Sequence, residues 1–243
     1  MVKTTAATAA PGQGVHQRYP WLVPGVLLLV LALLIVNAVA HAPLTGLDDW
    51  IRHAVQAEAK RRSLRWVRHG PNTPARQLNH LGLIAVGGPV LAVAAVIAAV
   101  RRRSLWPLLS AAAGGAMMLL LTYLGKLLIR EPAPRQVTLG PHDLGSFPSG
   151  HLATAGVCYF MAAVLLWPRR GSRSRRIALT VVTVVCAALG VSLIWCDLHW
   201  SSDVLAAAVL AALVVPLAAR LDASEPRTRA SARAQPDREP VTG

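Results

Sequence analysis

The chain has 243 residues, 54% of them hydrophobic and only 15% charged, with a mean hydropathy of +0.46. Such a composition excludes an ordinary water-soluble domain and indicates an integral membrane protein. The formal net charge of +14 would suggest a nucleic-acid partner in a soluble chain. Here the basic residues lie in clusters between apolar runs, which is typical of topology signals and of contacts with anionic lipids. Membrane lipids are therefore expected partners, and nucleic acid is not.

Most of the chain consists of long apolar runs separated by polar connections. A helix needs about 20 apolar residues to cross a bilayer, and six runs are predicted to span: residues 21–40, 81–100, 105–121, 152–167, 177–195 and 204–219. The first run is longer than the apolar part of a signal peptide, so it is predicted to remain as an uncleaved helix. Residues 21–219 are thus predicted to form one membrane domain. Residues 1–20 and 220–243 are polar, and both are expected to be disordered segments in the cytoplasm.

A polar connection, residues 41–80, separates the first two runs. Within it Leu47, Trp50, Ile51 and Val55 recur at helical spacing, which predicts an amphipathic helix lying on the membrane surface. The predicted fold is therefore all-α: an integral membrane six-helix bundle, with an amphipathic surface helix between the first and second helices.

The three cysteines, Cys158, Cys186 and Cys196, lie within or beside apolar runs. They show neither metal-ligand spacing nor an even-numbered disulfide pattern, so they are predicted to fill the core. No metal and no cofactor are expected. The sequence does not determine the oligomeric state.

The distribution of basic residues predicts the orientation, because loops rich in Lys and Arg remain in the cytoplasm. A cytoplasmic N-terminus places residues 101–103, the five arginines of 169–176 and the basic tail on that side. The connection 196–203 then faces outward and contains no Lys or Arg. Residues 41–80, with seven basic residues, oppose this orientation. The chain is thus predicted to be a multi-pass cell-membrane protein whose polar connections around the fourth and sixth runs meet outside the cytoplasm.

One of these outer segments, residues 146–151, leads directly into the fourth apolar run. Ser149 is a residue type preferred at a helix N-cap, and Gly150 allows a ligand to approach the backbone closely. The exposed N–H groups of a helix start form a site for an anion. His151 at that point can donate a proton to a leaving group. An ordinary turn followed by an interfacial histidine fits the same residues.

Two other segments carry polar side chains of this kind. His199 and Asp203 are four residues apart, which places them on one face of a helical turn. An aspartate that binds one imidazole nitrogen leaves the other nitrogen as a better nucleophile. Lys126, at the end of the third run, suits a phosphate as a point charge. A capping aspartate and a lysine that reaches the membrane interface are the alternative interpretations.

Together these residues resemble the type 2 phosphatidic acid phosphatase superfamily, also called the lipid phosphate phosphatases. That superfamily has three motifs in a fixed order: Lys-x6-Arg-Pro, Pro-Ser-Gly-His and Ser-Arg-x5-His-x3-Asp. The matching residues here are Lys126 and Pro134 for the first motif, Pro148, Ser149, Gly150 and His151 for the second, and Ser192, His199 and Asp203 for the third. The resemblance covers roughly residues 80–220.

The resemblance implies that the chain hydrolyses a lipid or polyprenyl phosphate or diphosphate by double displacement, without a metal. His199 would attack phosphorus and form a phosphohistidine, with Asp203 orienting it and His151 protonating the leaving oxygen. Lys126, Ser149 and the backbone N–H of Gly150 would hold the phosphoryl oxygens. Fixed donors and a helix N-terminus stabilise the charge that spreads over those oxygens.

Both arginines of these motifs are missing, and Ala133 and Leu193 occupy their positions. Arg130 and Arg135 are the candidates to replace the first arginine as phosphate-binding residues. Arg135 lies just beyond the expected position in an extended, Pro-flanked segment, so its side chain can point the same way. The fifth run offers no replacement for the second arginine. Loss of one such contact can cost about 2.7–4 kcal/mol of transition-state stabilisation, the scale of a lost oxyanion donor.

Two other functions fit a site without these arginines. Sphingolipid head-group transferases, related to the same superfamily, keep a His-His-Asp set and act on a phosphodiester that carries less charge. A non-catalytic lipid-binding descendant would also lack the arginines, although it would have no physical need for His151, His199 and Asp203. A transporter is disfavoured, because the sequence has neither paired broken helices nor a charge in mid-membrane.

Overall fold

The computed structural model describes residues 21–40, 44–61, 73–136, 138–168 and 171–223. Those residues form helices and irregular connections, with no strand among them. Residues 1–20 and 224–243, which were predicted to be disordered, lie outside the described part of the chain. The predicted tail began at residue 220, but residues 220–223 belong to the last helix.

The described helices are α2 (Leu22–Ala40), α3 (Leu44–Arg61), α5 (Pro74–Asn79), the 3-10 helix η1 (His80–Gly82), α6 (Ile84–Arg102), α7 (Trp106–Ile129), α8 (Gly150–Leu166), α9 (Arg173–Trp195) and α10 (Ser201–Ala223). In this part of the chain, five helices are long and apolar enough to cross a membrane: α2, α6, α7, α9 and α10. The remaining predicted run forms α8, which is apolar but has only 17 residues. The predicted all-α class is confirmed, and the chain is a multi-pass membrane protein.

The helices extend beyond the apolar runs at their polar ends. α7 continues past residue 121 to Ile129, so Lys126 lies within the helix and not after it. α10 likewise begins at Ser201 rather than at residue 204. An apolar run marks only the part of a helix that hydrocarbon can surround, whereas the helix continues until its hydrogen bonding is interrupted. Pro132 supplies that interruption after α7.

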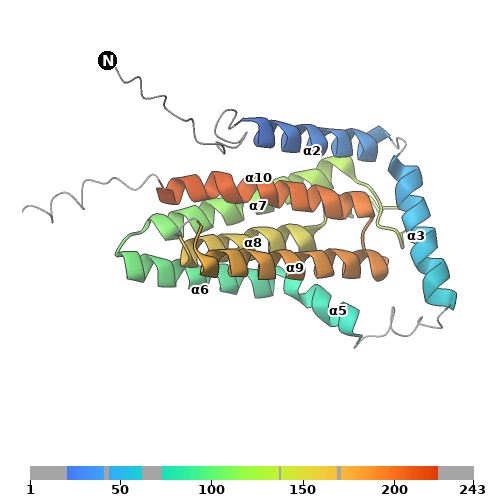
Figure 1. Ribbon diagram of the computed structural model, residues 1–243. Helices are drawn as coiled ribbons and strands as arrows, with labels where there is room; N and C mark the ends of the chain where they lie inside the picture. Colours follow the sequence, from blue (N-terminus) through green and yellow to red (C-terminus); the bar gives the residue numbers. More distant parts are fainter. Residues whose placement is uncertain (1–20, 41–43, 62–72, 137, 169–170, 224–243) are drawn as a thin grey trace, which may run out of the picture.

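α8 lies at the centre of the bundle, where it packs against α6, α7, α9 and α10 (Figure 1). Most of its side chains are buried. Small residues line its contact with α10, including Ala153 and Gly156 of α8 and Ala207 and Ala211 of α10. Close packing of small residues is the usual basis of helix association in lipid, because burial in a bilayer supplies little hydrophobic driving force between helices.

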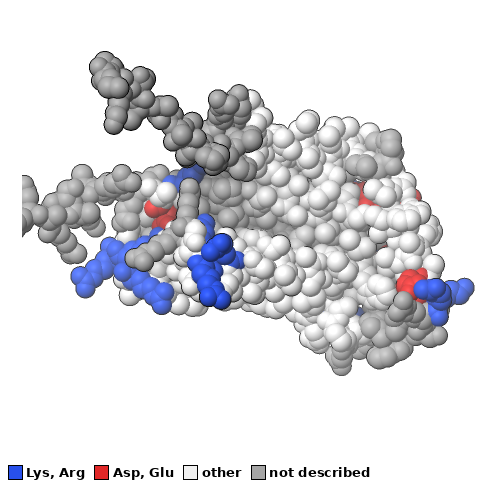
Figure 2. All heavy atoms as spheres, viewed as in Figure 1, with Lys and Arg blue, Asp and Glu red and all other residues white. Residues whose placement is uncertain are grey.

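Large apolar side chains cover the outside of the bundle. Leu29 and Val36 of α2, Val93 of α6 and Val184 of α9 are all more than half exposed. In Figure 2 the charged residues lie toward the two ends of the molecule, and the surface between them carries almost no charge. An apolar belt of this kind, too extensive for a soluble monomer, is the surface expected to face lipid.

Arginines gather at the end of the bundle where α6 ends, α9 begins and α10 ends, which we call the basic end. Those described there are Arg101, Arg102, Arg103, Arg173, Arg175, Arg176 and Arg220. Arg102 forms an ion pair with Asp222 at 2.6 Å and donates a hydrogen bond to the carbonyl of Leu165. These contacts tie α6, α8 and α10 together at the basic end.

α3 crosses the opposite end of the bundle, where it packs against α2 and α10 (Figure 1). It is the helix that the spacing predicted between the first and second spanning helices. Its Leu47 and Trp50 side chains are 49% and 66% exposed, as expected for a helix at a membrane surface. The short helices α5 and η1, which the sequence analysis did not predict, pack against α9 and α8.

We predict that Gly156→Ala destabilises the protein, whereas Gly115→Ala does not. A Cβ on Gly156 would lie 2.7 Å from the Cβ of Ala211, so α8 and α10 would have to move apart. Overpacking of this kind costs about 1–3 kcal/mol. Nothing lies within 4 Å of a Cβ on Gly115, so the alanine there gains only helix propensity, up to about 1 kcal/mol. Thermal unfolding in detergent measures the stability of both variants. Equal midpoints would contradict the close packing of α8 against α10 at Gly156.

Candidate active site

Three segments that are far apart in the sequence meet at the end of the bundle that α3 crosses (Figure 1). They are the last turn of α7 with the connection after it, the first turn of α8, and the connection between α9 and α10. The sequence analysis placed its site residues on these segments. The contacts described below bring most of those residues together.

His199 and Asp203 form a buried pair at the start of α10. The Nδ1 atom of His199 lies 3.1 Å from Oδ2 of Asp203, whose side chain is 0% exposed. The backbone N–H of Trp200 donates to the same oxygen at 3.3 Å. A buried carboxylate needs such donors to offset its lost hydration. With Nδ1 held by Asp203, the Nε2 atom of His199 is the nitrogen available to a ligand.

His151 faces His199 from the first turn of α8. The two imidazole rings meet edge to face, with 6.1 Å between their centroids. Gly82 of η1 fixes the backbone of His151, because a Cβ at residue 82 would lie 2.6 Å from the Cβ of His151. Only glycine permits this approach, so η1 helps to place His151.

The start of α8 has the capped structure that the sequence predicted. The hydroxyl oxygen of Ser149 accepts a hydrogen bond from the N–H of Leu152 at 3.4 Å, and Ser149 is fully buried. Its own N–H donates to the backbone carbonyl of Asp203 at 3.2 Å. The N–H groups of Gly150 and His151 have no carbonyl partner within the helix, because a helix leaves its first N–H groups unpaired. Those groups and the helix dipole favour an anion.

Lys126 lies beside this helix start. Its ammonium donates to the carbonyl oxygens of Gly145 at 2.9 Å and Ser146 at 3.1 Å. A Cβ on Gly150 would lie 3.6 Å from Cε of Lys126, which places the lysine stem against the first residue of α8. An ammonium group has three donors, so two carbonyl partners leave one N–H for a ligand.

The two candidate replacement arginines make different contacts. Arg130 donates to the carbonyl oxygens of Gly140 at 2.8 Å and Pro141 at 3.3 Å, within its own connection. Arg135 instead donates to the carbonyl oxygen of Cys196, shortly before His199. Arg135 is therefore tied to the segment that carries His199, and Arg130 is tied to a surface turn.

Residue 193, where the third motif has an arginine, is a core position in this chain. Leu193 is fully buried in the hydrophobic core between the helices. Its neighbour Ser192 lies within hydrogen-bond distance of the carbonyl of Ala75 and of Asn79 Oδ1, at 2.6 and 2.8 Å. This part of the third motif thus joins α9 to α5. Among the described residues, neither Leu193 nor Ser192 forms a hydrogen bond with His199.

α3 supplies two contacts to the connection between α9 and α10. Arg52 donates to the two carboxylate oxygens of Asp197 through Nε at 2.9 Å and Nη2 at 3.3 Å. Its guanidinium lies 5.5 Å from the centre of the Trp200 ring. The negative charge of Asp197 is thereby balanced. Asp48 accepts hydrogen bonds from the hydroxyls of Ser201 and Ser202 and from the N–H of Ser202 at 3.0 Å. α3 therefore holds the start of α10 in place.

The sequence analysis did not identify Asp48, Arg52 or Glu131 as site residues. Asp48 and Arg52 lie four apart on one face of the predicted surface helix, which signals a polar contact face but not its partner. Glu131, two residues after the end of α7, is 7% exposed. A single acidic residue after an apolar run was its only signal in the sequence. Among the described residues, no group of three or more His, Cys, Asp or Glu side chains is placed to hold a metal.

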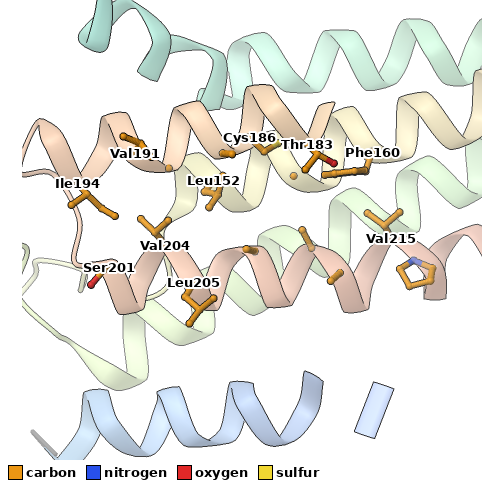
Figure 3. A pocket seen from close by; sticks show the side chains of 17 residues that line it. Leu152, Phe160, Thr183, Cys186, Val191, Ile194, Ser201, Val204, Leu205 and Val215 are labelled. Carbon is orange, nitrogen blue, oxygen red and sulfur yellow. The ribbon is translucent and has the colours of Figure 1, made fainter. Parts of the chain in front are cut away.

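An apolar groove of about 570 Å³ runs between α8, α9 and α10 (Figure 3). Its walls include Phe160 of α8 and Val191 of α9. At one end it reaches Leu152, which directly follows His151, and Ser201, at the start of α10. The free thiol of Cys186 is half-buried and lines this groove. Cys158 and Cys196 are free and buried, as the prediction of core-filling cysteines requires.

Fold and site together define a multi-pass helical membrane protein with a buried histidine–aspartate pair at one end of its bundle. The chain belongs to the PAP2 superfamily, whose family model matches residues 103–225, half of its length. It also matches the crystal structure of a transmembrane PAP2-type phosphatidylglycerolphosphate phosphatase from Bacillus subtilis. That match has a TM-score of 0.67 and 22% identity, and covers 84% of this chain and 98% of the other, which shows a shared fold. No curated protein matches the sequence significantly.

We predict that Asp48→Ala destabilises the protein and that Asp49→Ala is nearly neutral. Removal of the Asp48 carboxylate leaves two hydroxyls and one N–H at the start of α10 without their acceptor. Hydrogen bonds to a charged group contribute about 1.5–3 kcal/mol each. Asp49 is exposed on the same helix and serves as the matched control. Thermal unfolding in detergent should separate the variants, and identical curves would show that α3 does not hold α10.

Proposed function

We propose that this protein is a membrane phosphatase that removes phosphate from a lipid or polyprenyl phosphate or diphosphate, through a phosphohistidine intermediate. The observation that carries the proposal is the pair of His199 and Asp203 with His151 facing it at 6.1 Å between ring centres. One imidazole is oriented as a nucleophile, and the other is close enough to serve the same phosphoryl group.

In the proposed reaction, Nε2 of His199 attacks phosphorus while the bond from phosphorus to the leaving oxygen breaks. His151 donates a proton to that oxygen, and Asp203 stabilises the positive charge on the phosphorylated imidazole. Water then attacks phosphorus and gives its proton back to His151. The phosphorus–nitrogen bond breaks, and inorganic phosphate leaves with His199 restored.

Fixed donors at the start of α8 would bind the phosphoryl oxygens. The stem of Lys126 lies against Gly150, the first residue of α8. The Ser149 oxygen accepts the cap hydrogen bond from Leu152, and its hydroxyl proton would be donated to the phosphoryl group. Donors that are already in place stabilise developing charge without reorganisation. We assign the role of the missing first arginine to Arg135, because it contacts the segment that carries His199.

The groove between α8, α9 and α10 supports a lipid as the substrate. Its lining is almost wholly apolar, it begins beside the residues that follow His151, and it runs along the bundle (Figure 3). A hydrocarbon chain lying there would place its phosphate at the bundle end that holds the histidines. The Bacillus subtilis protein is a phosphatidylglycerolphosphate phosphatase, so that lipid is the first substrate to test.

We further propose that the site faces outward from the cytoplasm in the cell membrane. The site lies at the end of the bundle opposite the basic end, and loops rich in arginine remain in the cytoplasm. Lipid head groups of the outer leaflet would then reach it directly.

We predict that the purified protein releases phosphate from at least one member of a lipid phosphate panel, and that His199→Ala lowers the rate about a thousandfold or more. Loss of the nucleophile removes the covalent step, whereas His53→Ala, an exposed histidine of α3, should leave the rate unchanged. Released phosphate and acid-labile phosphorylated protein are the measurements.

Two results of this assay would contradict parts of this proposal. If His199→Ala retained full phosphate release, His199 would not be the nucleophile. If a second lipid received the labelled head group in preference to water, the protein would be a head-group transferase.

We also predict that Arg135→Ala lowers kcat/KM about a hundredfold, the scale of a lost phosphate donor, while Arg130→Ala changes it less than about threefold. Both substitutions remove one guanidinium from the same connection, so they are matched in charge. A larger loss with Arg130→Ala would assign the phosphate contact to Arg130 instead.

A further inference from the structure

Glu131 is held close to the site by its own backbone. It lies one residue beyond Arg130, the C-cap of α7, and its carbonyl accepts the N–H of Ser146 at 2.7 Å. The next carbonyl, of Pro132, accepts the indole N–H of Trp200 at 2.8 Å. These contacts bring a buried carboxyl, 7% exposed, against the connection that carries His199.

The carboxyl groups of Glu131 and Asp203 each have an oxygen without a donor. Oδ2 of Asp203 accepts from His199 and Trp200, but no N–H or O–H in the described part of the chain reaches its Oδ1. Oε2 of Glu131 is buried and equally unpaired. The negative charge of Asp203 acts on the Glu131 carboxyl, so the two groups lie near each other. Two carboxyl groups can hydrogen-bond only if a proton lies between them.

We propose that Glu131 is a positioning residue for the reaction: its protonated carboxyl donates to Oδ1 of Asp203 and so orients Asp203 on His199. The inference rests on the proposed function for the role of His199. Asp203 then accepts a hydrogen bond at each oxygen, which fixes the rotation of its carboxylate. Nδ1 of His199 can therefore donate only to Oδ2. The proton stays on Glu131 throughout the reaction.

The charges around the pair agree with a protonated Glu131. Burial, followed by the negative charge of Asp203, its hydrogen bond and the charge of Asp48, raises the pKa of the Glu131 carboxyl to about 9. Asp203 faces it from α10 and Asp48 from α3, while Lys126 of α7 and His199 are the cationic or titratable groups that face Asp203. At neutral pH the pair therefore has one proton and one negative charge.

The sign of the pH dependence follows from that raised pKa. Between about pH 4.5 and 9 the unfolded chain has lost the Glu131 proton and the folded chain still holds it. The folded state thus loses stability relative to the unfolded state as pH rises through this window. The stabilising contribution is complete below pH 4.5 and absent above 9.

Activity measurements test the positioning role. Glu131→Gln keeps an N–H donor and cannot ionise, so it should retain most activity at neutral pH and lose the alkaline decline of the wild type. Glu131→Ala has no donor and should lower kcat about tenfold to a hundredfold with little change in KM, because His199 is misplaced. Glu58→Gln, at the surface of α3, is the control and should match the wild type. An alkaline decline unchanged in Glu131→Gln would overturn the proposal.

Infrared spectroscopy tests the proton without any assay of turnover. The spectrum of the wild type minus that of Glu131→Gln should contain the carbonyl band of a protonated carboxyl at neutral pH, and the thermal midpoint of the variant should vary less with pH. Absence of the band would overturn the proposal. If the band is present and no lipid phosphate is hydrolysed, the proposed function fails while the proton shared by Glu131 and Asp203 is upheld.

Discussion

The buried carboxylate of Asp203 is the constraint on which the site depends. A charge without exposure to water, at the end of an apolar bundle, is tolerated only if donors surround it. His199 and the N–H of Trp200 supply them at one oxygen, and the backbone carbonyl of the same residue accepts the N–H of Ser149. One residue therefore joins the start of α8 to the start of α10. The hydrogen bonds of Asp203 therefore help to position both His199 and the start of α8, which carries His151.

The part of the chain before the matched family region also builds this site. The family model begins at residue 103, yet Asp48 and Arg52 of α3 bind the residues on both sides of His199. α3 lies across this end of the bundle (Figure 1), and its Asp48 accepts hydrogen bonds from the hydroxyls of Ser201 and Ser202. α3, the surface helix between the first two spanning helices, thus helps to hold the site in place.

The loss of two motif arginines changes how the proposed site would bind an anion. Leu193 belongs to the hydrophobic core, and an arginine there could not reach solvent without disturbing the packing of α9. The remaining donors are Lys126, the start of α8 and the nearby Arg135. Backbone N–H groups at a helix start carry about half a unit charge, fixed in direction. A site built mainly from such groups would select a ligand by the shape and position of its anionic group rather than by its total charge.

The sequence by itself determined the all-helical membrane class, five of the six predicted spanning helices and the pairing of His199 with Asp203. It could do so because apolar run length and i,i+4 spacing are local properties of a chain. It also placed Ser149 correctly at a helix start, since capping depends on neighbouring residues. Only the tertiary structure decided that α3 clamps α10, that Arg135 and not Arg130 contacts the segment of His199, and that Glu131 meets Asp203. These contacts join residues distant in sequence, and their geometry depends on how the helices pack, which no local pattern encodes.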